Sequence, residues 1–346
     1  MISSVSLLMT LAQDLLSGTF WQGTEPSSVT VKKTGRNPIT VQDGYYCVVK
    51  VVDGDTINIL PQLVQADAVC TDYDEHKVFE EKVSLRFNGV NTTECGKSGN
   101  SREEKCDAYG EPGSEGARLF TKSLVGFGPV ALDFHETDSY GRAVTIIRVK
   151  DSKTNTWIDV NRALIAGGYG FPYFIEEDLF YTDYVQALGE AWQNHTGLWA
   201  SDDWRNRPVI LTSYHPERKG NEEYARVQNI SPNNLSTKQY AFEYQETQYP
   251  ILDDNQNPIS IPPGRTLRVF PAFGTDQLDP TKGSLDVYLG LEQDMWDGEE
   301  PLLLRDKGSD GTQNKCVWAK VTRADLWSAV PRDCPRPAGV AKGKAE

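Results

Sequence analysis

Three short segments contain the residues whose types and spacing could carry out chemistry: residues 53–56, 86–94 and 138–142. Each segment is expected at a strand end or a turn, where side chains can converge. Together they offer carboxylate and amide oxygens, which suit a hard cation, and two guanidinium groups, which suit a phosphate. Phosphodiester cleavage needs such groups, because negative charge develops on the phosphate and a water must be activated. The three segments therefore offer the groups that phosphodiester cleavage requires.

Strands and helices around these segments would position them. The alternating apolar and polar residues at 45–60 predict two strands on either side of a turn at 53–55. Residues 83–90 predict a further strand. The other elements expected before residue 204 are a helix at 113–126, two strands within 129–150, a short helix at 159–170 and a longer helix at 178–192. This order predicts an α+β domain whose strands suit a small closed barrel.

In this order the three segments resemble the thermonuclease (staphylococcal nuclease-like) family, although each segment alone is an ordinary turn or strand end. The family carries a DGDT-type turn, an R-L-x-G-[IV]-D-x-P-E-type strand end and a D-x-Y-G-R turn. Further matching segments are residues 113–117, 160–168 and 197–199. The resemblance implies a five-stranded OB-type β-barrel with packed helices over residues 44–204. It also implies a calcium-dependent endonuclease that hydrolyses the phosphodiester bonds of DNA or RNA.

The resemblance implies a Ca²⁺ site formed by Asp55, Asn91 and the backbone carbonyl of Thr92. Two residues near this site depart from the family pattern. Asn91 stands where the family has Asp, so the site has one negative charge fewer and calcium is expected to bind more weakly. Thr93 replaces a Pro, which is expected to loosen the turn before Glu94.

The resemblance implies that Glu94 is the general base that activates water, and that Arg86 and Arg142 clamp the scissile phosphate. The residues implied to contact the substrate are Tyr140 and, after the Gly-rich turn, Tyr173 or Phe174. Families that keep such a fold only for binding typically lose several of these groups. The presence of Glu94 and both arginines therefore favours an enzyme.

The formal net charge of −14 opposes this interpretation, because proteins that bind nucleic acid usually carry a basic surface. Part of the acidic excess lies in a predicted loop insertion at residues 61–82. Single arginines can still contact phosphates locally, but weak, salt-sensitive duplex binding and a preference for single strands are expected. Two alternatives remain open: a non-catalytic nucleic-acid or protein-binding module on the same barrel, and a structural or surface-attachment protein.

Residues 205–330 show a different pattern, with short strands separated by Pro, Gly, Asn and Asp. Regular short strands of this kind predict a β-sandwich. Residues 229–231, 261–269 and 296–306 resemble conserved segments of the lamin-tail family. The resemblance implies an all-β, immunoglobulin-like sandwich that binds or tethers an unknown partner without catalysis.

The two ends of the chain are expected to lie outside these domains. Residues 1–43 form a predicted leader with a short amphipathic helix, because the leucines between Leu7 and Leu16 fall at helical spacing. Residues 331–346 are rich in Pro, Ala and Lys and are expected to be disordered. No stretch approaches the roughly 18 apolar residues of a membrane span, and no signal peptide is convincing. A soluble protein is expected, with the cytoplasm and secretion both left open.

The six cysteines could be either disulfide-bonded or free thiols. None forms a CxxC pair, so a zinc site is not expected. The cysteines could form disulfides in a secreted protein, with Cys95/Cys106 and Cys316/Cys334 as the sequence-local pairs, although other pairings are equally allowed. Free thiols in a cytosolic protein are the alternative.

Overall fold

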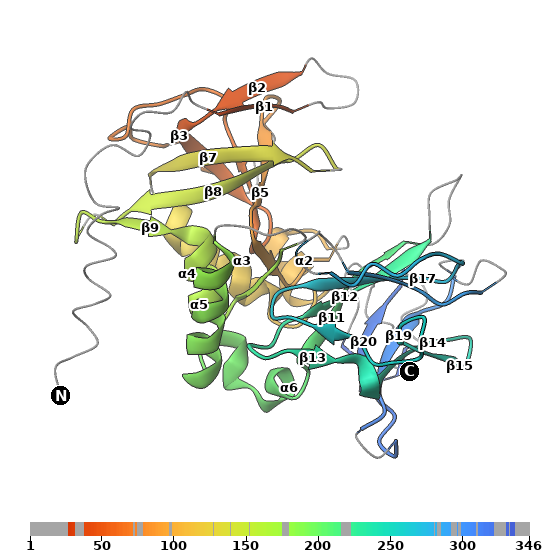
Figure 1. Cartoon of the computed structure of the whole chain (residues 1–346). Coiled ribbons are helices and arrows are strands. Elements are labelled where there is room, and N and C mark those ends of the chain that lie inside the picture. Colours follow the sequence, from red (N-terminus) through yellow and green to blue (C-terminus); the bar gives the residue numbers. More distant parts are fainter. Residues whose placement is uncertain are drawn as a thin grey trace. The chain divides into compact units, whose positions relative to one another are not determined.

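A computed structural model describes most of the chain between positions 27 and 335 (Figure 1). The described residues are 27–31, 38–71, 73–74, 79–96, 99–126, 128–138, 140–151, 153–174, 180–215, 223–279, 281, 285–291, 296, 299–308, 311–321, 330–331 and 333–335. The predicted N-terminal amphipathic helix lies outside the described residues, as do most of the predicted C-terminal tail and part of the predicted acidic insertion.

The chain folds into two compact units, and neither unit is continuous in sequence. The first contains Met1–Lys50, Ile57–Asn88 and Ser123–Val160. The second contains Val51–Thr56, Gly89–Lys122 and Asn161–Glu346. The second unit therefore includes segments from both sides of residue 204, where the sequence analysis places a domain boundary.

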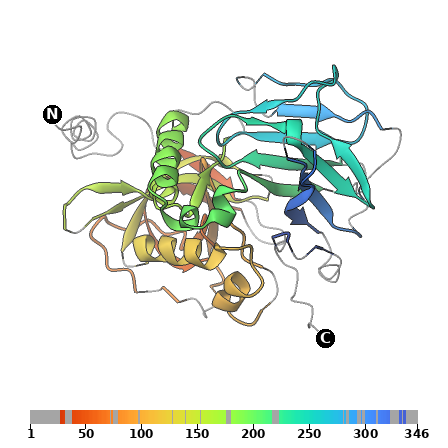
Figure 2. The same ribbon diagram turned by 90° about the horizontal axis from the view of Figure 1, so that it is seen from below.

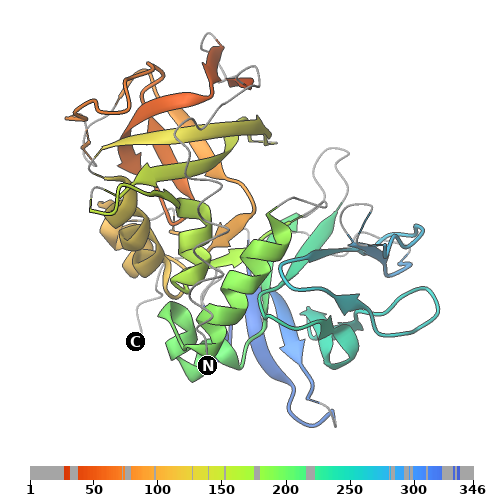
Figure 3. The ribbon, with the colours of Figure 1, turned by 60° about the vertical axis from the view of Figure 1, so that its left-hand side comes forward.

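A six-stranded sheet makes up most of the first unit, in the order β5-β4-β3-β7-β8-β9 (Figure 3, orange to yellow-green). Its strands are β3 (Gly44–Val51), β4 (Thr56–Ile59), β5 (Val83–Phe87), β7 (Pro129–Thr137), β8 (Ala143–Lys150) and β9 (Trp157–Asp159). β5 also pairs in parallel with β8, with Leu85 opposite Ala143. The first, third and fifth residues of β5 are buried, whereas Ser84 and Arg86 are partly exposed. This alternation is typical of a strand with one face against a core.

The strands predicted around the turn at 53–55, at 83–90 and within 129–150 are confirmed. The segment predicted as a leader also contains two antiparallel strands, β1 (Ser28–Val31) and β2 (Ile39–Gln42). The sequence analysis did not anticipate this hairpin, because four-residue strands give little periodicity.

Helices connect the strands and confirm the three helix predictions. The helices are α2 (Arg102–Asp107), α3 (Ser114–Val125), α4 (Val160–Ala166), α5 (Tyr181–Gln193), the 3-10 helix η1 (Gly197–Ala200) and α6 (Asp202–Arg205). Figure 2 shows α2 and α3 in gold as consecutive helices. α5 buries Tyr184, Ala187, Leu188 and Ala191, a single apolar stripe at helical spacing. In the second unit, β6 (Val90–Thr92) pairs antiparallel with β10 (Gly170–Pro172).

Two four-stranded sheets and a short strand pair account for the strands that the structure describes after residue 205. One sheet has the order β11-β12-β17-β18 and the other β15-β14-β19-β20, and β13 pairs with β16. The strands are β11 (Val209–His215), β12 (Tyr224–Asn229), β13 (Leu235–Ser236), β14 (Tyr240–Tyr244), β15 (Thr247–Pro250), β16 (Ser260–Ile261), β17 (Thr266–Phe270), β18 (Leu285–Tyr288), β19 (Leu302–Asp306) and β20 (Lys315–Lys320). The buried Trp296 ring contacts Tyr214 from one sheet and Phe242 from the other.

Tryptophan rings pack together across the predicted domain boundary at residue 204. Trp199 lies 4.6 Å from Trp192 and 6.4 Å from Trp204 between ring centroids. Trp204 in turn lies 5.9 Å from Trp318 of β20. Because Trp199, Trp204 and Trp318 are all buried, the core of the second unit is continuous through this point of the sequence.

The β-rich sheets and few helices give an α+β fold. All six cysteines are paired, as Cys95–Cys106, Cys316–Cys334 and Cys47–Cys70. The first two are the sequence-local pairings. In the part of the chain that the structure describes, no helix is long and apolar enough to cross a membrane.

Candidate functional site

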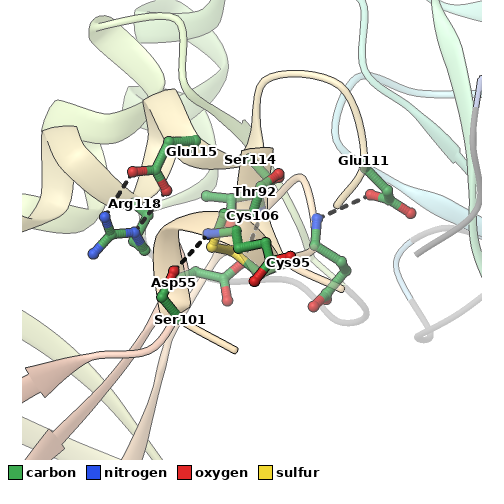
Figure 4. The surroundings of a disulfide bond; sticks show 11 residues. Asp55, Thr92, Cys95, Ser101, Cys106, Glu111, Ser114, Glu115 and Arg118 are labelled. Carbon is green, nitrogen blue, oxygen red and sulfur yellow. Dashed lines mark hydrogen bonds and ion pairs between the residues drawn. A yellow bond between two sulfur atoms is a disulfide. The ribbon is translucent and has the colours of Figure 1, made fainter. Parts of the chain in front are cut away.

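The turn between β3 and β4 places Asp55 against Thr92 at the end of β6 (Figure 4). Asp55 is 2% exposed. Its Oδ2 accepts hydrogen bonds from the backbone N–H of Thr92 at 2.6 Å and from the Thr92 hydroxyl at 3.0 Å. Gly54 allows this approach, because a Cβ at that position would lie 2.6 Å from Thr92 Oγ1. The DGD turn is therefore fixed by contact with β6.

Asn91 precedes Thr92 in β6 and is also buried. Its Nδ2 donates a hydrogen bond to Oε1 of Gln228 at 3.1 Å. Gln228 is a fully buried residue of β12, and its own Nε2 donates to the carbonyl of Pro172 at 2.7 Å. A residue of the predicted C-terminal domain thus orients one of the implied calcium ligands.

The oxygen donors around Asp55 suit calcium in kind but supply little charge. Asp55 and Thr92 are in direct contact, and Asn91 is adjacent to Thr92. Carboxylate, amide and carbonyl oxygens are the ligands that calcium prefers, with waters completing the shell. Within the described residues, no group of three or more His, Cys, Asp or Glu side chains could hold a metal. These residues therefore fit a weakly held calcium ion with one carboxylate.

Glu94 lies two residues after Thr92 and has an exposed side chain. Its backbone N–H donates to Oε2 of Glu111 at 3.0 Å, and its carbonyl accepts from the N–H of Glu111 at 2.8 Å. Cys95, the next residue, is bonded to Cys106 of α2. Figure 4 shows this disulfide and the hydrogen bond that the Glu111 carboxylate accepts. These bonds hold the turn that the sequence predicts to be loose.

Arg86 and Arg142 come from neighbouring strands of the first unit. Arg86 lies in β5 opposite Val144 of β8, and Arg142 immediately precedes β8. The Nε of Arg142 donates to Oδ2 of Asp138 at 2.7 Å, while Asp138 Oδ1 accepts from the backbone N–H groups of Tyr140 and Arg142. Within the turn at 138–142, Asp138 therefore bonds to both Tyr140 and Arg142.

Tyr140 is 74% exposed at the tip of that turn, and the Arg142 guanidinium lies 5.4 Å from the centre of its ring. Its exposure suits contact with a ligand. The structure thus gathers Arg86, Tyr140 and Arg142 on one unit. Asp55, Asn91, Thr92 and Glu94 lie together on the other.

The two candidates after the Gly-rich turn differ in exposure. Tyr173 is partly exposed, and its hydroxyl accepts a hydrogen bond from Nη1 of Arg226 at 2.6 Å. Phe174 is 4% exposed and packs against Tyr181 and Tyr184. Burial raises the pKa of the neighbouring Tyr181, although Arg265 acts in the opposite direction. Of the two, Tyr173 is the one with surface available to a substrate.

Sequence reasoning missed four residues that hold the implied site: Glu111, Arg226, Gln228 and Lys320. Glu111 is 4% exposed, and its Oε1 accepts from Nζ of Lys320 in β20 at 2.5 Å. Each of these residues bonds to a partner far away in sequence. No motif or periodicity marks such a pair, so only the three-dimensional arrangement identifies them.

Residues 84–201 match the family model of staphylococcal nuclease homologues. This segment is therefore similar to staphylococcal nuclease homologues. The match runs from β5 to the residue after η1 and includes Arg86, Glu94 and Arg142. Asp55 and the strands after residue 205 lie outside it. No curated protein matches the chain.

Proposed function

We propose that the chain is a calcium-dependent nuclease that hydrolyses phosphodiester bonds of DNA, RNA or both. The observation that carries the proposal is the exposed Glu94, presented on a fixed backbone two residues after the buried Asp55–Thr92 contact. The nuclease-like match over residues 84–201 supports it, since Glu94 and both arginines lie inside the matched segment.

The chemistry divides among a few groups. Asp55, Asn91 and the Thr92 carbonyl would hold Ca²⁺, which when bound offsets phosphate charge and makes a nearby water more acidic. Glu94 takes the proton from the attacking water. Arg86 and Arg142 donate hydrogen bonds to the phosphoryl oxygens, where negative charge grows.

Tyr140 and Tyr173 would contact the substrate. The exposed Tyr140 hydroxyl can donate to a phosphate, and the Tyr173 ring can stack on a base. Arg226 holds the Tyr173 hydroxyl and so limits the rotation of that ring. The buried Phe174, which packs against Tyr181 and Tyr184, is assigned a supporting role.

The finer architecture is part of the proposal. The pairing of β5 with β8 supports a five-stranded OB-type barrel made of β3, β4, β5, β7 and β8. The contacts of Trp296 with rings from both C-terminal sheets support an immunoglobulin-like, lamin-tail-like sandwich over residues 205–330. This region would bind a partner without catalysis, beside the nuclease-like domain over residues 44–204.

One observation favours the alternative, a non-catalytic nucleic-acid or protein-binding module on the same barrel. The net charge of −14 weakens attraction to nucleic acid. Both functions use the same residues for binding, but only the nuclease needs Glu94. A cleavage assay therefore separates them.

Purified protein is expected to degrade single-stranded DNA or RNA with added calcium and to stop when a chelator is added. Glu94→Gln and Arg142→Ala are each expected to reduce kcat/KM by about 10²–10⁴-fold, because each removes a group that acts in the transition state. The measurement is cleavage of a labelled oligonucleotide, with thermal unfolding as the test of folding.

Two controls match these variants. Glu103→Gln changes an exposed glutamate of α2, and Arg148→Ala changes an ion-paired arginine within β8. Both are expected to leave cleavage near the wild-type rate. A wild-type protein that binds oligonucleotides but cleaves none with any divalent metal would establish the binding module instead.

A further inference from the structure

Both backbone polar groups of Glu94 bond to the same residue, Glu111. The Glu94 N–H donates to the Glu111 carboxylate at 3.0 Å, and the Glu94 carbonyl accepts from the Glu111 N–H at 2.8 Å. We call this pair of bonds the Glu94–Glu111 clamp. Because both backbone polar groups of Glu94 are bonded to one neighbour, its Cα is fixed while its side chain stays exposed.

The clamp depends on a charge from the C-terminal strands. Glu111 is 4% exposed, and a carboxylate at such a depth needs hydrogen bonds and an opposite charge. Oε2 receives the Glu94 N–H, and Oε1 receives Nζ of Lys320 at 2.5 Å. Lys320 is the last residue of β20, and its side chain is 13% exposed. The ion pair joins residues 209 positions apart.

A disulfide closes the chain directly after the clamp. Cys95 is bonded to the buried Cys106, and within this loop the N–H of Gly96 donates to the carbonyl of Lys105 at 2.7 Å. The Ser114 hydroxyl donates to the Cys106 carbonyl at 2.7 Å, which ties the loop to the start of α3. On the other side of Glu94, Thr93 is fully buried. Glu94 is therefore anchored from both directions along the chain.

Gly110 shows how closely these parts fit. A Cβ at this position would lie 2.2 Å from Ser114 Oγ, 2.4 Å from the Cys106 carbonyl oxygen and 3.0 Å from the Glu94 carbonyl oxygen. Only a glycine leaves room for α2, α3 and the Glu94 segment to meet here.

We propose that Glu111, balanced by Lys320, is a positioning residue for Glu94. The inference rests on the proposed nuclease function, in which Glu94 removes a proton from water. Glu111 touches neither water nor phosphate in this role and acts only through the Glu94 backbone. A displacement of about 1 Å at a reacting group can reduce a rate about 10²-fold, so the clamp has a measurable effect on catalysis.

Two double variants isolate the clamp. Glu111→Gln/Lys320→Met removes both charges but keeps an oxygen that can accept the Glu94 N–H. Glu111→Leu/Lys320→Met removes the same charges and the acceptor as well. Because neither variant leaves a buried charge without a partner, the pair differs chiefly in the hydrogen bond to Glu94.

The variants are compared by kcat and KM for calcium-dependent oligonucleotide cleavage and by hydrogen exchange of the Glu94 amide. Glu111→Leu/Lys320→Met is expected to lose about 10²-fold in kcat relative to Glu111→Gln/Lys320→Met, with little change in KM, because a base is displaced and substrate contacts remain. Exchange at Glu94 should be faster in the leucine variant only. A purely structural role would lower stability without splitting kcat from KM.

If the Glu111→Leu/Lys320→Met variant fails to fold, a pair of variants that each remove one disulfide provides the test instead. Cys95→Ser/Cys106→Ser is expected to lower kcat and speed exchange at Glu94. The matched control is Cys47→Ser/Cys70→Ser, which removes a disulfide of the other compact unit. This variant should leave kcat unchanged.

The outcomes distinguish the two proposals. Equal kcat in the leucine and glutamine variants, or equal kcat after removal of the Cys95–Cys106 bond when the leucine variant is unfolded, overturns the positioning role and leaves the nuclease intact. A wild-type protein without cleavage overturns the nuclease and the positioning role together.

Discussion

Asn91 stands where the nuclease family has an aspartate. The change removes a negative charge, and the amide also bonds to Gln228. Gln228 cannot rotate its amide freely, because its Nε2 donates to Pro172 while its Oε1 accepts from Asn91. An aspartate in place of Asn91 would set a carboxylate against Gln228 Oε1. The amide at residue 91 therefore satisfies the packing against β12 and also lowers the charge of the implied calcium site.

The Asn91→Asp variant is expected to be less stable without calcium and to bind calcium more tightly. The loss of unfolding free energy should be about 1–3 kcal/mol, the usual effect of leaving a buried polar group unsatisfied. Added calcium should raise the unfolding midpoint more than in the wild type, because a ligand stabilises the state that binds it. Thermal unfolding with and without calcium, together with titration calorimetry, measures both effects.

Asn58→Asp is the matched control for this change. Asn58 is a buried asparagine of β4 whose Oδ1 accepts from the Ser84 hydroxyl at 2.8 Å. This variant should gain nothing from calcium. If Asn91→Asp also gains nothing, residue 91 does not ligate the metal.

Among the elements, the β11–β12 pair has a titratable residue, His215, at the last position of β11, opposite the first residue of β12. His215 of β11 stacks on Tyr224 of β12, with ring centroids 4.5 Å apart. Burial, and then the charge of Arg226, lower the pKa of His215 below its ordinary value of 6.5. The unfolded chain therefore takes up a proton at a higher pH than the folded chain. The contribution of His215 to the free energy of unfolding is therefore constant above pH 6.5, and it falls as the pH drops from 6.5 through the pKa of the folded state.

His215→Phe is expected to flatten this dependence, because phenylalanine keeps the ring stack but takes up no proton. Urea unfolding at several pH values between 7 and 5 gives the slope of the unfolding free energy against pH. His135→Gln, at an exposed histidine of β7, is the comparison. An unchanged slope in His215→Phe would assign the acid sensitivity to other groups.

Sequence alone could predict the elements that are long enough to show a repeating pattern of apolar and polar residues. Alternation along β3, β5 and β8 and the apolar stripe of α5 are such patterns. The three-residue strands β6 and β10 have no period of their own and form through their pairing. Asn91 and Thr92 lie in β6, so the local structure around the implied metal site followed from tertiary contacts.

At the scale of the whole molecule, the implied site depends on strands beyond residue 205. Gln228 orients Asn91, Arg226 holds the Tyr173 hydroxyl, and Lys320 balances Glu111. The motifs of the nuclease-like segment could be recognised in the sequence, because each is a short run of residues and the runs follow one another in a fixed order. These supporting contacts could not, since each joins residues far apart and only folding brings them together.

A fragment ending at residue 204 is expected to be markedly less stable than the full chain. Removing one partner of a buried ion pair, here Lys320 beside Glu111, costs about 3–5 kcal/mol, and the apolar face of Trp204 is exposed as well. Urea unfolding of both proteins measures the difference, and oligonucleotide cleavage reports the state of the site. A fragment that unfolds at the same midpoint and cleaves equally well would show an independent domain ending at residue 204.

Three disulfides suit an oxidising compartment, because cytosolic reductants keep most thiols reduced. The bond at Cys95–Cys106 closes the loop next to Glu94. A chain held in shape by such bonds would fold fully only under oxidising conditions.

The row of tryptophans from Trp192 to Trp318 supplies an optical reporter within the protein. Indole rings 4.6–6.4 Å apart in a fixed geometry couple their electronic transitions, and near-ultraviolet circular dichroism detects such fixed packing. Trp318 belongs to β20, whereas Trp192 and Trp199 lie in the nuclease-like segment. The signal of the coupled rings therefore reports whether β20 is packed in its native position. The docking of this strand can be followed in real time without any label.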